Sequence, residues 1–243
     1  MPEPAPTGLR AGGPIEPTRV SPFDLDARTA GRLGLGASAA ILVGAVVTAS
    51  AYVGPTGEAY SPFNHFISEL GETGQSRLAL VFNAGIVIGG LGLGLFLFVL
   101  AGHLTARYRP TLMLAALVSG ASGTLVGFFP MDTHEAHRLV SGVFFCTGWI
   151  VVAIFSAWLA RHRAAGLPGW LLVVGAGSIA IFLAFLAVYA TYRPADPNAP
   201  IMVRSAVWAV PLLEWASLLS LLAWFVCVSA VLLRRRRWPA SQA

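Results

Sequence analysis

The stretch that decides the fold is LALVFNAGIVIGGLGLGLFLFVL, which runs from Leu78 to Leu100 and contains no ionisable side chain. A helix needs about 20 mostly apolar residues to cross the hydrocarbon core of a bilayer. The stretch shows no strict alternation of polar and apolar residues, which a half-buried strand would require. It therefore predicts a transmembrane helix.

Five further stretches have the same character, and the intervening segments are too polar to stay in lipid. The chain is 56% hydrophobic and only 11% charged, whereas a soluble domain carries about 25% charged residues. These observations predict an all-α integral membrane bundle of six transmembrane helices. The predicted spans are Leu33–Val53, Leu78–Leu100, Leu112–Phe129, Leu139–Leu159, Trp170–Ala190 and Val207–Leu233.

The chain divides into three parts. Residues 1–30 are rich in Pro, Gly, Ala and Thr and have no long apolar run, which predicts a disordered cytoplasmic tail. Residues 31–233 form the predicted six-helix transmembrane domain. Residues 234–243 begin with four consecutive arginines and form a short basic tail, also predicted to be cytoplasmic.

Orientation follows from the arginines, because loops rich in Lys and Arg stay on the cytoplasmic side. All sixteen basic residues are arginine, and twelve of them lie in the two tails, the second loop or the fourth loop. We therefore expect a multi-pass protein of the cell membrane with cytoplasmic N- and C-termini. The arginines form no single soluble face, so we expect membrane lipids as partners and no nucleic acid.

The first external loop contains the segment Tyr60–Gly71. Ser61 and Pro62 suit the start of a helix and Gly71 suits its end, so a short interfacial helix is predicted between them. Such a helix would place the side chains of His65, Ser68 and Glu69 on one face. The alternative is an amphipathic helix whose polar face only meets water.

The second external loop, Pro130–Arg138, leads directly into the fourth span. Asp132 or Thr133 could cap that helix, and His134, His137 and Arg138 would then share a face. Two histidines one turn apart beside carboxylates suit a metal half-site or an acid/base pair. The alternative is the solvated start of a helix.

Two polar residues lie inside apolar spans, near their outer ends. Asn83 is in the second span and Glu214 is about two turns inside the sixth. A carboxylate in a membrane helix normally faces a partner or a water-filled cavity, because exposure to lipid is costly. The alternative for Glu214 is a structural ion pair, for instance with Arg138 or Arg204.

All these residues map to the outer half of the bundle, which predicts one polar pocket open to the extracytoplasmic leaflet. The candidate catalytic residues are His65, Ser68, Glu69, Asp132, His134, His137 and Glu214. The candidate substrate-binding residues are Asn64, Asn83, Arg138 and Arg204.

The sequence resembles the uncharacterised membrane family labelled domain of unknown function 998. The resemblance lies in Tyr60-Ser-Pro62, Ile67-Ser-Glu-Leu-Gly71, Asn83-Ala-Gly85 and the stretch from Phe128-Phe-Pro130 to His137. It implies a helical membrane protein without an assigned activity. Members often have Glu-Arg in the last span, whereas here Trp215 follows Glu214, so the resemblance gives no support for a Glu–Arg pair in that helix.

Three classes of function fit the sequence. The first is an enzyme, a hydrolase or transferase acting on a lipid, with a histidine as general base or metal ligand, Ser68 as a candidate nucleophile and an arginine holding a phosphate. A divalent metal is a candidate cofactor. The second class is a transporter component, and the third is a non-catalytic membrane scaffold or sensor.

Overall fold

The computed structural model describes residues 27–162, 166–192 and 205–234. The predictions for the two tails and for Arg204 concern residues outside these ranges, apart from the first helical residues at 27–30 and Arg234. Six helices in the described part are long and apolar enough to cross a membrane, which confirms the all-α, six-span prediction. They are α1 (Ala27–Ser50), α2 (Ala79–Gly102), α3 (Arg109–Phe128), α4 (Glu135–Arg161), α5 (Trp170–Thr191) and α6 (Ala209–Leu233).

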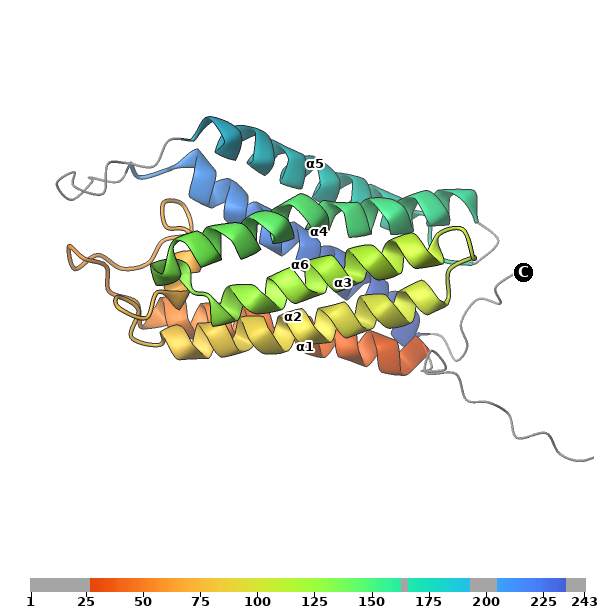
Figure 1. Ribbon diagram of the computed structural model, residues 1–243, viewed down its shortest axis with the longest axis horizontal. Coiled ribbons are helices and arrows are strands. Elements are labelled where there is room, and N and C mark those ends of the chain that lie inside the picture. Colours follow the sequence, from red (N-terminus) through yellow and green to blue (C-terminus); the bar gives the residue numbers. More distant parts are fainter. Residues whose placement is uncertain (1–26, 163–165, 193–204, 235–243) are drawn as a thin grey trace, which may run out of the picture.

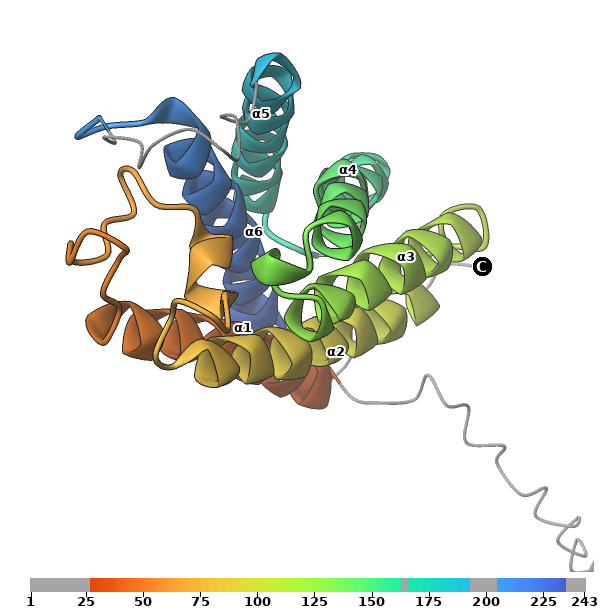
Figure 2. The ribbon, with the colours of Figure 1, turned by 60° about the vertical axis from the view of Figure 1, so that its left-hand side comes forward.

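The helices form a ring in chain order (Figures 1 and 2). Each packs on the helix that follows it in the chain, and α6 closes the ring by packing on α1. Contact across the ring is slight, since α4 barely touches α6. We call the end of the ring where α1 finishes and α6 begins the loop end, and the opposite end the terminal end.

Glycines allow α2 to approach both of its neighbours closely. A Cβ atom added to Gly85 would lie 2.7 Å from the carbonyl oxygen of Ala40 on α1. A Cβ atom on Gly120 of α3 would lie 2.8 Å from the Cα atom of Gly94 on α2. Because lipid tails are as apolar as the side chains, such close backbone approach supplies the dispersion energy that holds membrane helices together.

The outer surface of the ring is apolar, as a lipid-facing surface must be: Leu80 is 77% exposed and Val173 is 74% exposed. Inside the ring, aromatic side chains fill the half nearer the terminal end. The phenyl group of Phe225 lies edge-on to that of Phe96, and the indole of Trp224 lies edge-on to the phenyl group of Phe155. This half of the interior is therefore solidly packed.

The loop end is different, because polar connecting segments cover it. Only Ile67–Gly71 is helical in the first of these segments, as the 3-10 helix η1, and four of its five residues are buried. The structure thus shows a short buried turn in place of the predicted interfacial helix between Ser61 and Gly71. In Figure 2 this turn lies inside the ring, where it contacts α1, α2 and α6. A second 3-10 helix, η2 (Met131–Thr133), precedes α4.

Candidate functional site

Two adjoining cavities open beneath η1. The inner cavity, of about 90 Å³, lies within the ring and is lined by α1, α2, α3, α4 and α6. The outer cleft, of about 400 Å³, lies between α4, α5 and the start of α6. Five residues, which we call the shared rim, line both cavities: Ser68, His137, Ser141, Phe145 and Glu214.

Glu214 is fixed by the connecting segment that covers the ring. Its carboxylate is only 6% exposed, and Oε2 accepts a hydrogen bond of 2.8 Å from the backbone N–H of Ile67 in η1. Pro211 occupies the first turn of α6. Proline has no backbone N–H, and in the first turn this breaks no hydrogen bond of the helix. The bond ties the last helix to a segment 147 residues earlier in the chain and holds the carboxylate at the rim.

His137 contributes an imidazole from the first turn of α4. Its Nδ1 lies 2.8 Å from the carbonyl oxygen of Phe129. A carbonyl can only accept, so Nδ1 carries the proton in this arrangement and Nε2 of the neutral ring is left as a base. Asn83 borders the inner cavity and donates a hydrogen bond of 2.9 Å to the carbonyl of Gly71, which fixes the end of η1 to α2.

His134 and Arg138 line the mouth of the outer cleft together with His137. The three residues thus line one cleft, although His134 precedes α4 and does not belong to the helical face predicted from their spacing. His134 has a φ of 39° and a ψ of −89°, a strained conformation for a residue with a side chain. The Arg138 guanidinium forms an exposed ion pair of 2.6 Å with Glu135, a contact worth little energy in water. An anion in the cleft can therefore compete for Arg138.

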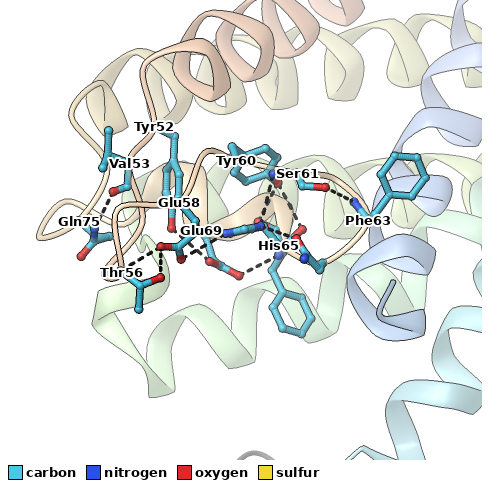
Figure 3. A network of polar contacts seen from close by, with 12 residues as sticks. Tyr52, Val53, Thr56, Glu58, Tyr60, Ser61, Phe63, His65, Glu69 and Gln75 are labelled. Atoms are coloured by element: carbon cyan, nitrogen blue, oxygen red, sulfur yellow. Dashed lines mark hydrogen bonds and ion pairs between the residues drawn. The ribbon is translucent and has the colours of Figure 1, made fainter. Parts of the chain in front are cut away.

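A separate hydrogen-bonded network lies on the α1 side of η1 (Figure 3). The carboxylate of Glu69 accepts from the N–H of Phe66 at 2.8 Å and from the hydroxyl of Tyr52 at 3.2 Å. Tyr60 donates to the carbonyl of Phe66 at 2.9 Å and accepts from the indole N–H of Trp215 at 2.8 Å. These contacts join the residue Tyr52 just after α1 to the rest of the first connecting segment, and that segment to α6.

The pKa values of two side chains in this network, Tyr60 and Glu58, favour the hydrogen bonds that they make. Burial raises the pKa of the Tyr60 hydroxyl, so Tyr60 stays protonated and remains a donor. The hydroxyl of Thr56 hydrogen-bonds the Glu58 carboxylate, and this bond with the backbone N–H groups lowers the pKa of Glu58 to about 2. Glu58 also lies 3.7 Å from Nε2 of the buried His65.

The structure divides the predicted site residues into two groups. Ser68, Asn83, His134, His137, Arg138 and Glu214 surround the two cavities. The others lie apart from them: Glu69 and His65 belong to the network, Asn64 bonds the carbonyl of Ser205 and approaches His65, and Asp132 accepts from Thr73. The alternative reading of Glu214, an ion pair with Arg138, is not what the structure shows, since Arg138 pairs with Glu135; the other partner named for it, Arg204, lies outside the described residues.

Sequence reasoning missed Ser141, Phe145, Tyr52, Glu58 and Trp215. Ser141 follows His137 by four residues, so the helical spacing alone would have placed it on the same face. Trp215 and Tyr52 gave no such signal, because their contacts span 155 and 17 residues of the chain.

Within the described ranges, no three His, Cys, Asp or Glu side chains come together in a way that could hold a metal ion. The two cysteines, Cys146 and Cys227, are free thiols. The rim thus offers one imidazole, one carboxylate and two hydroxyls for chemistry.

The comparisons with known proteins bear on the whole bundle. Neither a curated protein nor a solved structure matches the chain significantly. The model of one family, described as "Protein of unknown function (DUF998)", matches residues 37–231. This range runs from α1 to α6 and includes every residue of both cavities, η1 and the network. The chain is therefore a multi-pass membrane protein that belongs to the DUF998 family.

Proposed function

We propose that this chain is a membrane-embedded enzyme, a hydrolase or transferase, that acts on the head group of a lipid in the outer cleft. The observation that carries the proposal is the shared rim. Ser68, His137 and Glu214 come from three distant parts of the sequence and line the same two cavities. Structural polar residues in a bundle need no such common cavity.

The groups suit acid/base catalysis at an ester. His137 presents Nε2 as a base that takes the proton of an attacking water or alcohol, and its imidazolium then returns a proton to the leaving oxygen. Arg138 and His134 at the mouth suit the negative charge of a phosphate. In this proposal Glu214, held by the N–H of Ile67, and Ser68 orient the reacting groups from the rim.

The distribution of arginines supports a position in the outer leaflet of the cell membrane. Twelve of the sixteen lie in the two tails or in the stretches of sequence around the connections from α2 to α3 and from α4 to α5, which favours the cytoplasm on the side of the terminal end. The cleft would then receive lipid from the extracytoplasmic leaflet.

A transporter fits less well, because a polar solute needs a polar path across the whole bundle. In the described part of the ring, the inner cavity ends against Leu97 and Phe225, and aromatic side chains fill the space beyond. A scaffold role would leave the cavities without a use.

The test compares His137→Gln with His162→Gln in purified protein reconstituted with a panel of lipids. Gln keeps a side-chain N–H donor and removes the basic nitrogen. His162 is a matched control, since its Nδ1 lies 2.9 Å from the carbonyl of Trp158 in the same way but at the terminal end. Loss of the general base should slow turnover by about 10²–10⁴-fold, and the control should match the wild type. No lipid product from wild-type protein, or equal turnover in His137→Gln, would contradict the proposal.

A further inference from the structure

The inner cavity meets the outer cleft at the shared rim. We propose that it holds the acyl chain of a phosphate-bearing lipid whose head group occupies the outer cleft, and that the chain enters sideways between α4 and α5. This inference rests on the proposed function and deepens it, because it names the chemical class of the ligand and the route by which it arrives.

The lining of the inner cavity is suited to hydrocarbon. Most of its residues are apolar, and five helix glycines form part of the wall without any side chain: Gly90, Gly94, Gly120, Gly123 and Gly148. Of the few polar residues on the wall, Ser119 lies deep, and Asn83 and the rim lie at the loop end. Apolar cavities stay dry and accept apolar guests. A polar head at the rim and a hydrocarbon tail below it match this gradient.

The depth of the cavity fits an extended chain. Glu214 and Phe225 both line it and are eleven residues apart on α6, which corresponds to roughly 16 Å along the axis. Leu218, Leu221 and Leu222 line the wall between them. We call the end of the cavity at Val151, Leu222 and Phe225 the floor. It is rigid, because Phe225 packs against Phe96 and Trp224. The cavity therefore limits the length of the chain that it accepts.

The outer cleft opens toward the membrane. Gly142 and Cys146 on α4 and Tyr189 on α5 line it and are all exposed on the side of the bundle. A Cβ atom on Gly142 would meet no atom within 4 Å, so the space beside this glycine is open. Inside a bilayer the molecules at such an opening are lipids, and a lipid entering there brings its tail to the shared rim.

The test uses a lysophosphatidic acid that carries a photoreactive diazirine at the end of its acyl chain, added to the full-length protein in nanodiscs of uncharged lipid. After irradiation, mass spectrometry locates the cross-links. The inference predicts cross-links at the floor, on Val151, Leu222 or Phe225. Cross-links confined to outward residues such as Leu117 and Val173, which are 67% and 74% exposed, would overturn it.

Two pairs of variants test the route and the floor. Gly142→Trp should block the opening, while Gly177→Trp on α5, where a Cβ atom also meets open space, should not. Val151→Phe should fill the floor and Val173→Phe should not. In the first variant of each pair, we expect cross-linking at the floor to fall by roughly tenfold or more. This is the scale on which an apolar pocket discriminates against a group that does not fit it. Equal cross-linking within both pairs would refute the assignment.

The outcome separates this inference from the proposed function. If the floor is labelled but wild-type protein converts no lipid, the chain-binding site stands and the enzyme proposal fails. If lipid is converted but the floor is never labelled, the inference fails and the enzyme proposal stands.

Discussion

Replacement of Glu214 by alanine tests whether η1 is held to α6 through the carboxylate. In the wild type, the buried N–H of Ile67 donates to Oε2 at 2.8 Å. Alanine removes the acceptor, and a buried donor left unpaired costs about 1–3 kcal/mol. Because Glu214 borders a cavity that admits water on its outer side, we expect a loss toward the lower end of that range. Glutamine supplies a side-chain carbonyl in the same place and should cost less than about 1 kcal/mol, the net value of one hydrogen bond.

The assay is reversible unfolding in mixed micelles by titration with sodium dodecyl sulfate, which gives the free energy of unfolding for wild type, Glu214→Ala and Glu214→Gln. The order of stability should be wild type, then glutamine, then alanine. Alanine at least as stable as glutamine would refute the reasoning, since it would mean that the N–H of Ile67 does not depend on this acceptor. Catalytic turnover should fall in both variants, because both lack the carboxylate.

Three other predictions concern the bundle, the network and the mouth of the cleft. Gly85→Val should destabilise the bundle by about 1–3 kcal/mol, since even a Cβ atom there lies 2.7 Å from the carbonyl oxygen of Ala40; an unchanged free energy of unfolding would contradict the close packing of α1 and α2. Glu58 has a pKa lowered from 4.5 to about 2, so its contribution to stability is present above pH 4.5 and is lost as the pH falls toward 2. Thr56→Val removes the largest cause of that shift, and melting curves between these pH values should show less acid sensitivity than in the wild type; identical curves would count against the network. His134→Gly should raise stability by up to about 1–3 kcal/mol by relieving the backbone strain at φ 39°, while turnover falls because the cleft loses an imidazole; a less stable variant would show that the side chain outweighs the strain.

The six helices could be predicted from sequence because apolar run length is a local signal. The predicted span Leu78–Leu100 differs from α2, Ala79–Gly102, by one residue at its start and two at its end. The site was harder, because its geometry depends on a segment without regular periodicity. Between Ser61 and Gly71 the sequence predicts a helix with His65, Ser68 and Glu69 on one face. In the structure the Tyr52 hydroxyl and the Phe66 N–H hold Glu69 on the α1 side, and Ser68 lies at the rim.

The contact of Glu214 with the first connecting segment could be inferred only from the energetic cost of placing a carboxylate in lipid. A carboxylate two turns inside a membrane helix needs a polar environment, and the other carboxylates of residues 31–233 all lie in the external loops or at their borders. That reasoning predicts a shared recess but not the partner. The bond is made by a backbone N–H, that of Ile67, and a backbone group leaves no trace in the sequence.

Ser68 and Ser141 lie at the shared rim, and the proposed function requires that water and a lipid head group both reach them. The most direct test is the reaction of Ser68→Cys and Ser141→Cys with a charged, membrane-impermeant thiol reagent, with Cys146 and Cys227 replaced by alanine. Both introduced thiols should react, and an alkyl phosphate should protect them, while Leu139→Cys on the lipid-facing side should react slowly and without protection. Failure of both rim thiols to react, or reaction that an alkyl phosphate leaves unchanged, would contradict the account.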